Sequence, residues 1–177
     1  MSAVRTPEEA AIRMLALVAV SGVAQGVDRT EVVDWLVREH LWDQLTPSEA
    51  RFLEAPDPTE RDVIAFSWRM ECVYVLGWAL MIHDRLSPPT EQASIGSILE
   101  SVPAPGESTA EFIRHSQLRD AGTIHLAAEE YTDMHARARY TPGAASRDIE
   151  VIQERHLALN WLIRYEELAW DDVTTDA

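Results

Sequence analysis

The sequence contains no lysine, and all 15 of its basic residues are arginine. This absence excludes the chemistries that depend on a lysine amine, namely Schiff-base formation, phosphate binding by a P-loop lysine and general-base catalysis by lysine. Cysteine is nearly absent as well, because Cys72 is the only one, so no disulfide can form within the chain. Cys72 lies inside an apolar run, where we expect its thiol to be a small, unreactive hydrophobic group.

The chain also lacks the short motifs that mark common catalytic and cofactor sites. It has no Gly-x-Ser-x-Gly nucleophile elbow, no Gly-x-Gly-x-x-Gly loop and no pair of cysteines. Hydrolase, dinucleotide-binding and structural-zinc functions are therefore left without a motif. We predict no cofactor, and we favour a protein that is not an enzyme while keeping an enzyme as the alternative.

Positive charge is scarce relative to negative charge. The 30 acidic residues against 15 basic ones give a formal charge of -15 and a pI near 4.7. Such a balance repels phosphate backbones and anionic lipid headgroups, so we expect neither nucleic acid nor a membrane as a partner. The acids are interleaved with arginines instead of forming a run, which is typical of a solvated surface. A basic protein as partner, or mimicry of DNA, stays open.

A chain of 177 residues, 46% of them hydrophobic, is long enough to bury a sizeable core. Chains of this size hide about 70% of the surface that they expose when unfolded. We predict one all-helical domain over residues 1–177. The apolar stretch from Met14 to Val20 resembles the core of a signal peptide, but Glu8 and Glu9 precede it where a secretory segment is positively charged. We therefore expect a cytoplasmic protein, and its oligomeric state stays open.

The stretch from Cys72 to Ile82 is the element around which we expect the fold to be organised. It contains no charged residue, and a helix that is apolar on all sides is a buried helix. The run is too short to cross a bilayer. We predict a central helix over about residues 59–86, with a bend near Phe66 because it would be longer than most globular helices.

Other helices are expected to begin at capping boxes, in which a Ser or Thr is followed three residues later by Glu. Three such boxes begin at Thr6, Thr46 and Ser108, and Asp28 gives a related start. The last long helix is expected over residues 147–164. No segment alternates β-branched and polar residues between hairpin turns. We predict an all-α fold, a single globular multi-helix bundle around the buried central helix.

Charge placed next to the apolar surface of the central helix is the main candidate for a site. Arg69 and Glu71 stand two residues apart, a spacing that points side chains to different sides of a helix, so each needs a partner from another segment. The candidate partners are Glu154, Arg155, Asp171 and Asp172. We favour an ion-pair clasp that holds the C-terminal segment against the central helix. The alternative is a polar pocket that binds a small charged ligand.

His125, Glu129 and Asp133 form a second group, spaced by four residues within a polar helix that we expect on the outside of the fold. The spacing places the three side chains on one face, as metal ligands require. Solvated helix faces often produce such trios, and no Glu-x-x-His or His-Glu-x-x-His motif accompanies this one. We predict no metal, with these three residues as weak candidates.

Three ordered stretches carry a family resemblance. They are SWRME at 67–71 with GWAL at 77–80, ERHLALNWL at 154–162, and WDDVTTD at 170–176. With these stretches the chain resembles domain-of-unknown-function family 4272, a family of mostly bacterial proteins, over nearly its whole length. The resemblance implies that the Trp-Arg-x-Glu, Glu-Arg and Trp-Asp-Asp residues form one constellation. It implies no function, because the family is named for lacking one.

Two functions are compatible with these observations. The first is a cytoplasmic helical protein that acts by binding another protein, as an accessory or immunity-like factor. The second is an enzyme or a small-ligand receptor whose polar site is formed by Arg69, Glu71, Glu154, Arg155 and Asp171. A deep pocket lined by unpaired polar groups would favour the second function, and the same groups fully paired would favour the first.

Overall fold

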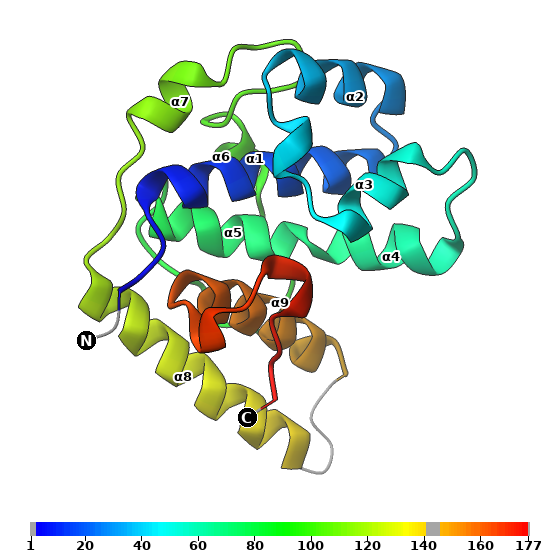
Figure 1. The fold of residues 1–177 in the computed structure, drawn as a ribbon. Helices are drawn as coiled ribbons and strands as arrows, with labels where there is room; N and C mark the ends of the chain where they lie inside the picture. The colour runs from blue at the N-terminus through cyan, green and yellow to red at the C-terminus, as the bar shows by residue number, and fades with distance from the viewer. Residues whose placement is uncertain (1–2, 141–145, 177) are drawn as a thin grey trace.

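The structure is a computed structural model and describes residues 3–140 and 146–176. Over these residues the chain forms α-helices and short 3-10 helices (η) without any strand, so the fold is all-α (Figure 1). In chain order the helices are α1 (Pro7–Ala24), α2 (Arg29–Arg38), η1 (Trp42–Gln44), α3 (Pro47–Glu54), α4 (Glu60–Trp68), α5 (Met70–Ala79), α6 (Gly96–Leu99), α7 (Ala110–Arg114), α8 (Ala121–Tyr140), α9 (Ser146–Leu162), η2 (Tyr165–Glu167) and η3 (Trp170–Asp172).

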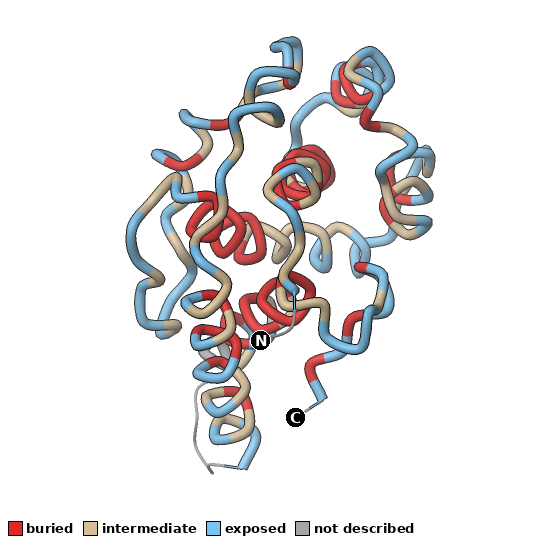
Figure 2. The backbone as a smooth tube through the Cα atoms, turned by 60° about the vertical axis from the view of Figure 1, so that its left-hand side comes forward, coloured by how far each residue is buried: buried red, intermediate tan, exposed pale blue. Residues whose placement is uncertain are grey.

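The core of the molecule lies along α1, α5 and α9. Every residue from Glu71 to Leu80 is buried, as expected of a helix that is apolar all round. α1 packs on one side of α5 and α9 on the other, while α8 covers α9 from outside (Figure 1). Buried residues run round the central helices and along single faces of the outer ones (Figure 2). None of the described helices is both long enough and apolar enough to span a membrane.

α1 begins where the sequence predicts. Thr6 Oγ1 accepts a hydrogen bond from the Glu9 amide at 3.1 Å, and Glu9 Oε2 accepts one from the Thr6 amide at 2.7 Å, which completes the capping box. The helix passes through Gly22 and ends before Gly26, whose φ is +100°. That left-handed conformation is one that glycine adopts readily. Gly26 therefore terminates α1, and Gly22 lies within it.

The central helix is broken and only its second half is buried. In place of one helix over residues 59–86, bent near Phe66, the chain forms α4 and α5 with a turn at Arg69 between them. α4 has no buried residue, whereas α5 is buried almost throughout. The two halves differ because α4 carries charged residues in its first turn and remains at the surface. The buried central helix is therefore α5 alone.

α5 also ends earlier than expected, at Ala79. Met81 takes a left-handed φ of +63°, which reverses the chain after the last turn. Arg119 supports this ending, because its Nε donates to the Trp78 carbonyl at 2.7 Å and its amide to the Ala79 carbonyl at 2.9 Å. A side chain from a distant loop thus satisfies carbonyls that a helix end leaves without partners.

α7 does not begin with the capping box expected from Ser108. Its N-cap is Thr109, whose side chain makes no capping hydrogen bond. The amide and the hydroxyl of Thr109 instead donate to Glu39 Oε2, at 2.8 and 3.1 Å. Thr109 is buried, so a contact with the end of α2 replaces the local cap.

Candidate functional site

The first interior ion pair joins the start of α5 to α9. Arg69 Nη1 donates to both carboxylate oxygens of Glu154, at 2.9 and 2.7 Å. The Cys72 thiol donates to Glu154 Oε2 at 3.3 Å. Burial lowers the pKa of Arg69, but the neighbouring Glu154 carboxylate outweighs this effect and raises the pKa above its ordinary value. Arg69 is therefore a permanent cation that occupies both oxygens of its partner.

The second interior pair is almost completely buried. Arg155 Nε donates to Glu71 Oε2 at 2.8 Å, and the two side chains are 0% and 4% exposed. Arg155 Nη1 also donates to the Ser87 carbonyl at 2.6 Å and the Tyr131 hydroxyl at 3.1 Å, and Glu71 Oε1 accepts from the Ala93 amide at 2.7 Å. Arg155 Nη2 is buried with no hydrogen-bond partner among the described residues. We call the two pairs together the interior clasp; it ties α5, α8, α9 and the loop after α5.

Among the residues that the structure describes, no group beside the interior clasp is poised as a nucleophile. Burial, and then the Glu154 carboxylate, raise the pKa of the Cys72 thiol well above its ordinary value. Burial likewise raises the pKa of Tyr131, although Arg155 beside it acts in the opposite direction. Both groups are protonated near neutral pH, and the thiolate rather than the thiol is the reactive form of cysteine.

The other two candidate partners lie elsewhere. Asp171 Oδ2 accepts from the Ser48 amide at 3.1 Å and Oδ1 accepts from the Ser48 hydroxyl at 2.8 Å. Burial raises the pKa of Asp171, but the hydrogen bonds from Ser48 and Thr46 and the charge of Arg13 outweigh it and lower the pKa below its ordinary value. Its carboxylate thus lies at the N-terminus of α3, where helix amides favour an anion. Asp172 is exposed on η3. Asp171 therefore fixes the C-terminal segment to α3, and neither aspartate joins the interior clasp.

The metal candidates lie on α8 without forming a ligand cage. Asp133 is exposed and faces Arg137 at 3.9 Å. His125 and Glu129 line a hollow of about 220 Å³ beside His156 of α9. Among residues 3–140 and 146–176, no three His, Cys, Asp or Glu side chains are grouped so that they could hold a metal ion.

A comparison with models of known protein families identifies the family of this chain. The model of the family described as Domain of unknown function (DUF4272) matches residues 1–173 of this chain. The chain belongs to that family. No curated protein and no solved structure matches it. In this DUF4272 protein the Trp-Arg-x-Glu and Glu-Arg motifs supply the two interior pairs, while Trp-Asp-Asp supplies the separate contact with α3.

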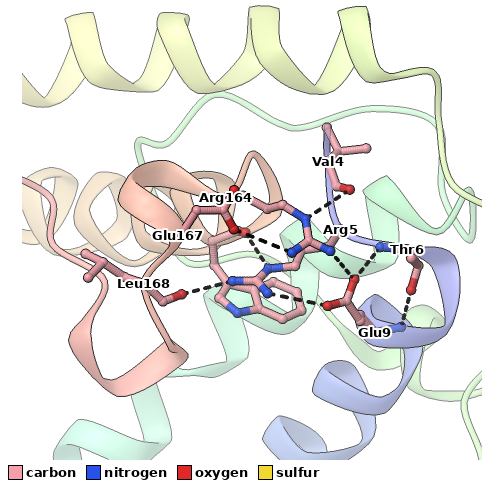
Figure 3. Close-up of polar contacts among 8 residues, drawn as sticks. Val4, Arg5, Thr6, Glu9, Arg164, Glu167 and Leu168 are labelled. Carbon is pink, nitrogen blue, oxygen red and sulfur yellow. Dashed lines mark hydrogen bonds and ion pairs between the residues drawn. The ribbon is translucent and has the colours of Figure 1, made fainter. Parts of the chain in front are cut away.

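This DUF4272 protein has a second charged cluster, which was not predicted from the sequence. We call it the terminal clasp, and it consists of Arg5, Glu9 and Arg164 (Figure 3). Glu9 Oε2 accepts from Arg164 Nη2 at 2.9 Å, Glu9 Oε1 accepts from Arg5 Nη1 at 3.4 Å, and Arg5 Nη2 donates to the Leu168 carbonyl at 2.9 Å. Burial raises the pKa of Glu9, but the Thr6 amide and the two arginines outweigh it and lower the pKa. The sequence predicted a role for Glu9 only in the capping box at the start of α1, and not in an ion pair.

Another buried pair of the DUF4272 protein was also missed. Arg13 Nη2 lies 2.6 Å from Glu49 Oε2, and both side chains are buried. The Arg13 guanidinium stacks over the Trp170 ring at 5.3 Å, which is a cation-π contact. The periodicity of α1 gave no indication that a neighbouring helix would supply a carboxylate at this position.

Two buried histidines form a further polar group of the interior. His135 Nδ1 and His156 Nδ1 lie 3.1 Å apart, and Thr132 Oγ1 lies 3.0 Å from His156 Nε2. Burial, then the His135 ring and the charge of Arg139, lower the pKa of His156 to about 4. Burial and Arg139 also lower the pKa of His135. Both rings are therefore neutral at pH 7, with one Nδ1 donating to the other.

Proposed function

We propose that this protein acts by binding another protein, as an accessory or immunity-like factor, and that it is not an enzyme. In this proposal the interior clasp holds the helices in place and has no catalytic role. The chain is an all-α member of a family of unknown function. The partner, the cytoplasmic location and the absence of catalysis are the parts that we propose.

The observation that carries the proposal is the pairing of the interior carboxylates. Each oxygen of Glu71 and of Glu154 accepts a hydrogen bond from a donor inside the protein. A general base must reach its substrate with an available lone pair and a suitable pKa. A substrate that needed an unpaired carboxylate as its base would have to displace Arg69 or Arg155 from it. The pairing therefore supports a structural role over a catalytic role for these charges.

Two surface properties support a protein partner. The formal charge of -15 favours a partner with a basic surface, because complementary charge accelerates association and selects among partners. Large apolar side chains are also exposed, and each could be buried by a partner; they include Val37 at 56%, Ile64 at 51% and Leu126 at 57%. A cytoplasmic location is supported by the single cysteine, because secreted domains are the ones that use disulfides.

The experiment that tests the proposal compares thermal and urea unfolding of the wild type with Arg69→Ala, each with and without a panel of metabolites. The Arg69 and Glu154 side chains are 25% and 14% exposed. Their pair therefore lies between a surface pair and a buried one, and we expect a loss of about 2 kcal/mol. Any compound that stabilises the wild type should stabilise the folded variant equally, because Arg69 binds Glu154 and not a ligand.

Arg61→Ala is the matched control, since Arg61 lies exposed on α4 and its removal should change stability by less than about 0.5 kcal/mol. The proposal is wrong if Arg69→Ala melts with the wild type while some compound stabilises only the wild type. Such a result would place a ligand at Arg69. The partner itself is tested by salt: a complex with a basic protein should weaken steeply between low and high ionic strength.

A further inference from the structure

Two small hollows lie side by side near the C-terminus of α1, and they differ in character. One is apolar, has a volume of about 230 Å³, and is lined mainly by valine, leucine and proline side chains from α1, α2 and the loop after α6. The other also has a volume of about 230 Å³ and is lined by polar side chains, among them Gln92 and Glu71. Gln25 and Met70 line both. The two hollows therefore meet at these residues, and Met70 is flexible enough to adapt to a ligand that extends through both.

The way in which α1 ends creates the apolar hollow. The amides of Gly26 and Val27 donate to the carbonyls of Val23 and Gly22, at 3.0 and 2.9 Å, which is a Schellman motif. Such motifs commonly pack the residue after the left-handed position against a side chain one turn back. Here the residue one turn back is Gly22, which has no side chain, and Val27 remains 43% exposed. The backbone holds an apolar side chain at the rim of a space that the protein leaves unfilled.

The polar hollow offers hydrogen-bond acceptors in an acidic setting. Of the described residues that line it, Glu71 is the only charged one. Its two oxygens accept from the Ala93 amide and Arg155 Nε, and a carboxylate has about four lone-pair sites, so it can accept further bonds. The exposed amides of Gln25 and Gln92 add carbonyl acceptors at the same end. A cationic donor suits this end, and the net charge of -15 also opposes anions.

We infer that these joined hollows form a binding site for a small amphipathic amine, with its apolar body beside Val27 and its ammonium group toward Glu71. An apolar cavity of roughly 150 Å³ is large enough for benzene, so the apolar hollow has room for a ring with a short side chain. None of the terminal clasp residues lines either hollow, and neither does Arg69 or Arg155. The site is thus additional to the partner protein proposed above.

The test is a titration of the full chain at pH 7.5 with three probes that share one ring and differ in the head group: 2-phenylethylamine, 2-phenylethanol and 3-phenylpropionate. Binding is followed by the amide NMR shifts of Gly22, Gly26 and Val27. We expect saturable shifts with the amine and a Kd at least tenfold higher for the carboxylate. Equal affinity for amine and carboxylate, or no saturable shift with any probe, overturns the inference.

Gly22→Leu supplies the decisive variant, because its side chain would fill the apolar hollow. A Cβ at Gly22 meets only Val27, at 3.4 Å or more, and leucine favours a helix more than glycine does, so the melting temperature should stay level or rise. Amine binding should weaken at least tenfold. Ala110→Leu, the same kind of change beside a different hollow, should leave binding unchanged. If Gly22→Leu does not fold, Val27→Ser at the exposed rim takes its place, and undiminished binding by the folded variant contradicts the inference.

Discussion

The interior clasp and the terminal clasp use the same chemistry in different surroundings. The Arg155–Glu71 pair and the Arg164–Glu9 pair have almost equal lengths, 2.8 and 2.9 Å. Their side chains are 0% and 4% exposed in the interior pair, against 25% and 36% in the terminal pair. The distance between the charged atoms therefore says little about how much each pair contributes to stability. Burial distinguishes them, because water and salt can replace a lost partner only at the surface.

The largest expected effect comes from breaking the interior pair on one side. Glu71→Ala leaves the Arg155 guanidinium buried without its carboxylate, and removing one partner of a buried pair costs about 3 to 5 kcal/mol. Urea unfolding monitored by far-UV circular dichroism measures the loss. A change below about 1 kcal/mol would mean that water reaches Arg155, and the contrast between the two clasps would then fail.

A double variant separates the contribution of the ion pair to the free energy of unfolding from the cost of leaving one charge buried without a partner. Glu71→Leu combined with Arg155→Met replaces both charges by apolar groups of similar size, and such exchanges are often nearly neutral. We expect the double variant to be more stable than Glu71→Ala alone, although the Ala93 amide and the Ser87 carbonyl each lose a partner. A double variant as unstable as the single one would show that the pair contributes more than compensation of charge.

Mild acid should affect the interior and leave the terminal clasp intact. His156 has its pKa lowered from 6.5 to about 4, so below pH 6.5 the unfolded chain binds a proton that the folded chain does not. Stability is therefore lost as pH falls, by about 2 kcal/mol between pH 7.5 and pH 5. The pKa of Glu9 lies below its ordinary value, so the terminal clasp stays charged over this range. Urea unfolding at a series of pH values measures the slope.

The variant His156→Gln isolates the contribution of the histidine pair from that of the many carboxylates. Glutamine can still bond Thr132 and has no proton to gain, so the stability should change less between pH 7.5 and pH 5 than in the wild type, by about 2 kcal/mol. His115→Gln is the matched control, since His115 follows α7 as its C-cap and is 69% exposed. An unchanged slope in His156→Gln would mean that the buried ring titrates normally.

The starts of α1 and α3 could be predicted from the sequence, unlike the start of α7, and helix ends could be predicted only where glycine marks them. Thr6 and Thr46 cap α1 and α3 through bonds to residues three positions away, so the signal is local. Gly26 marks the end of α1 in the same way. His40 and Met81 take the left-handed conformation after α2 and α5 without being glycine. Each of them closes a Schellman motif through its own amide and the amide of the next residue, which bond carbonyls of the last helical turns. Because neither residue is glycine, no residue type in the sequence marks these two helix ends.

The partners of the charged residues could also be predicted only in part from the sequence. Spacing indicated that Arg69 and Glu71 need partners from another segment, and Glu154 and Arg155 supply them. Spacing could not separate Asp171 from this group, because its contact with α3 depends on where the chain goes after α9. The terminal clasp joins residues that are 155 positions apart. Helical periodicity describes only neighbours within a few turns, so a pair of this kind has no sequence signal.

A smaller effect is expected where the C-terminal segment meets α3. Asp171→Ala removes the acceptor of the Ser48 amide and hydroxyl, and loss of such a cap costs about 1 kcal/mol. Asp172→Ala is the control on the adjacent residue, whose carboxylate is exposed, and it should change stability by less than about 0.5 kcal/mol. Equal losses from the two variants would show that the contact with α3 does not hold the segment.

The smallest effect is expected at the terminal clasp itself. Arg164→Ala removes the closer of the two arginines that bind Glu9, but Arg5 and the Thr6 amide still donate to that carboxylate. Because the pair is partly exposed, we expect a loss of about 0.5 kcal/mol in dilute buffer and none in 1 M NaCl, where screening acts within about 3 Å. Glu71→Ala, measured alongside it, should keep its full loss in 1 M NaCl, since salt does not reach a buried pair. If Arg164→Ala instead costs several kcal/mol in both buffers, the terminal clasp stabilises the fold as much as the interior clasp does. The exposure of an ion pair would then not indicate how much the pair contributes to the stability of this protein.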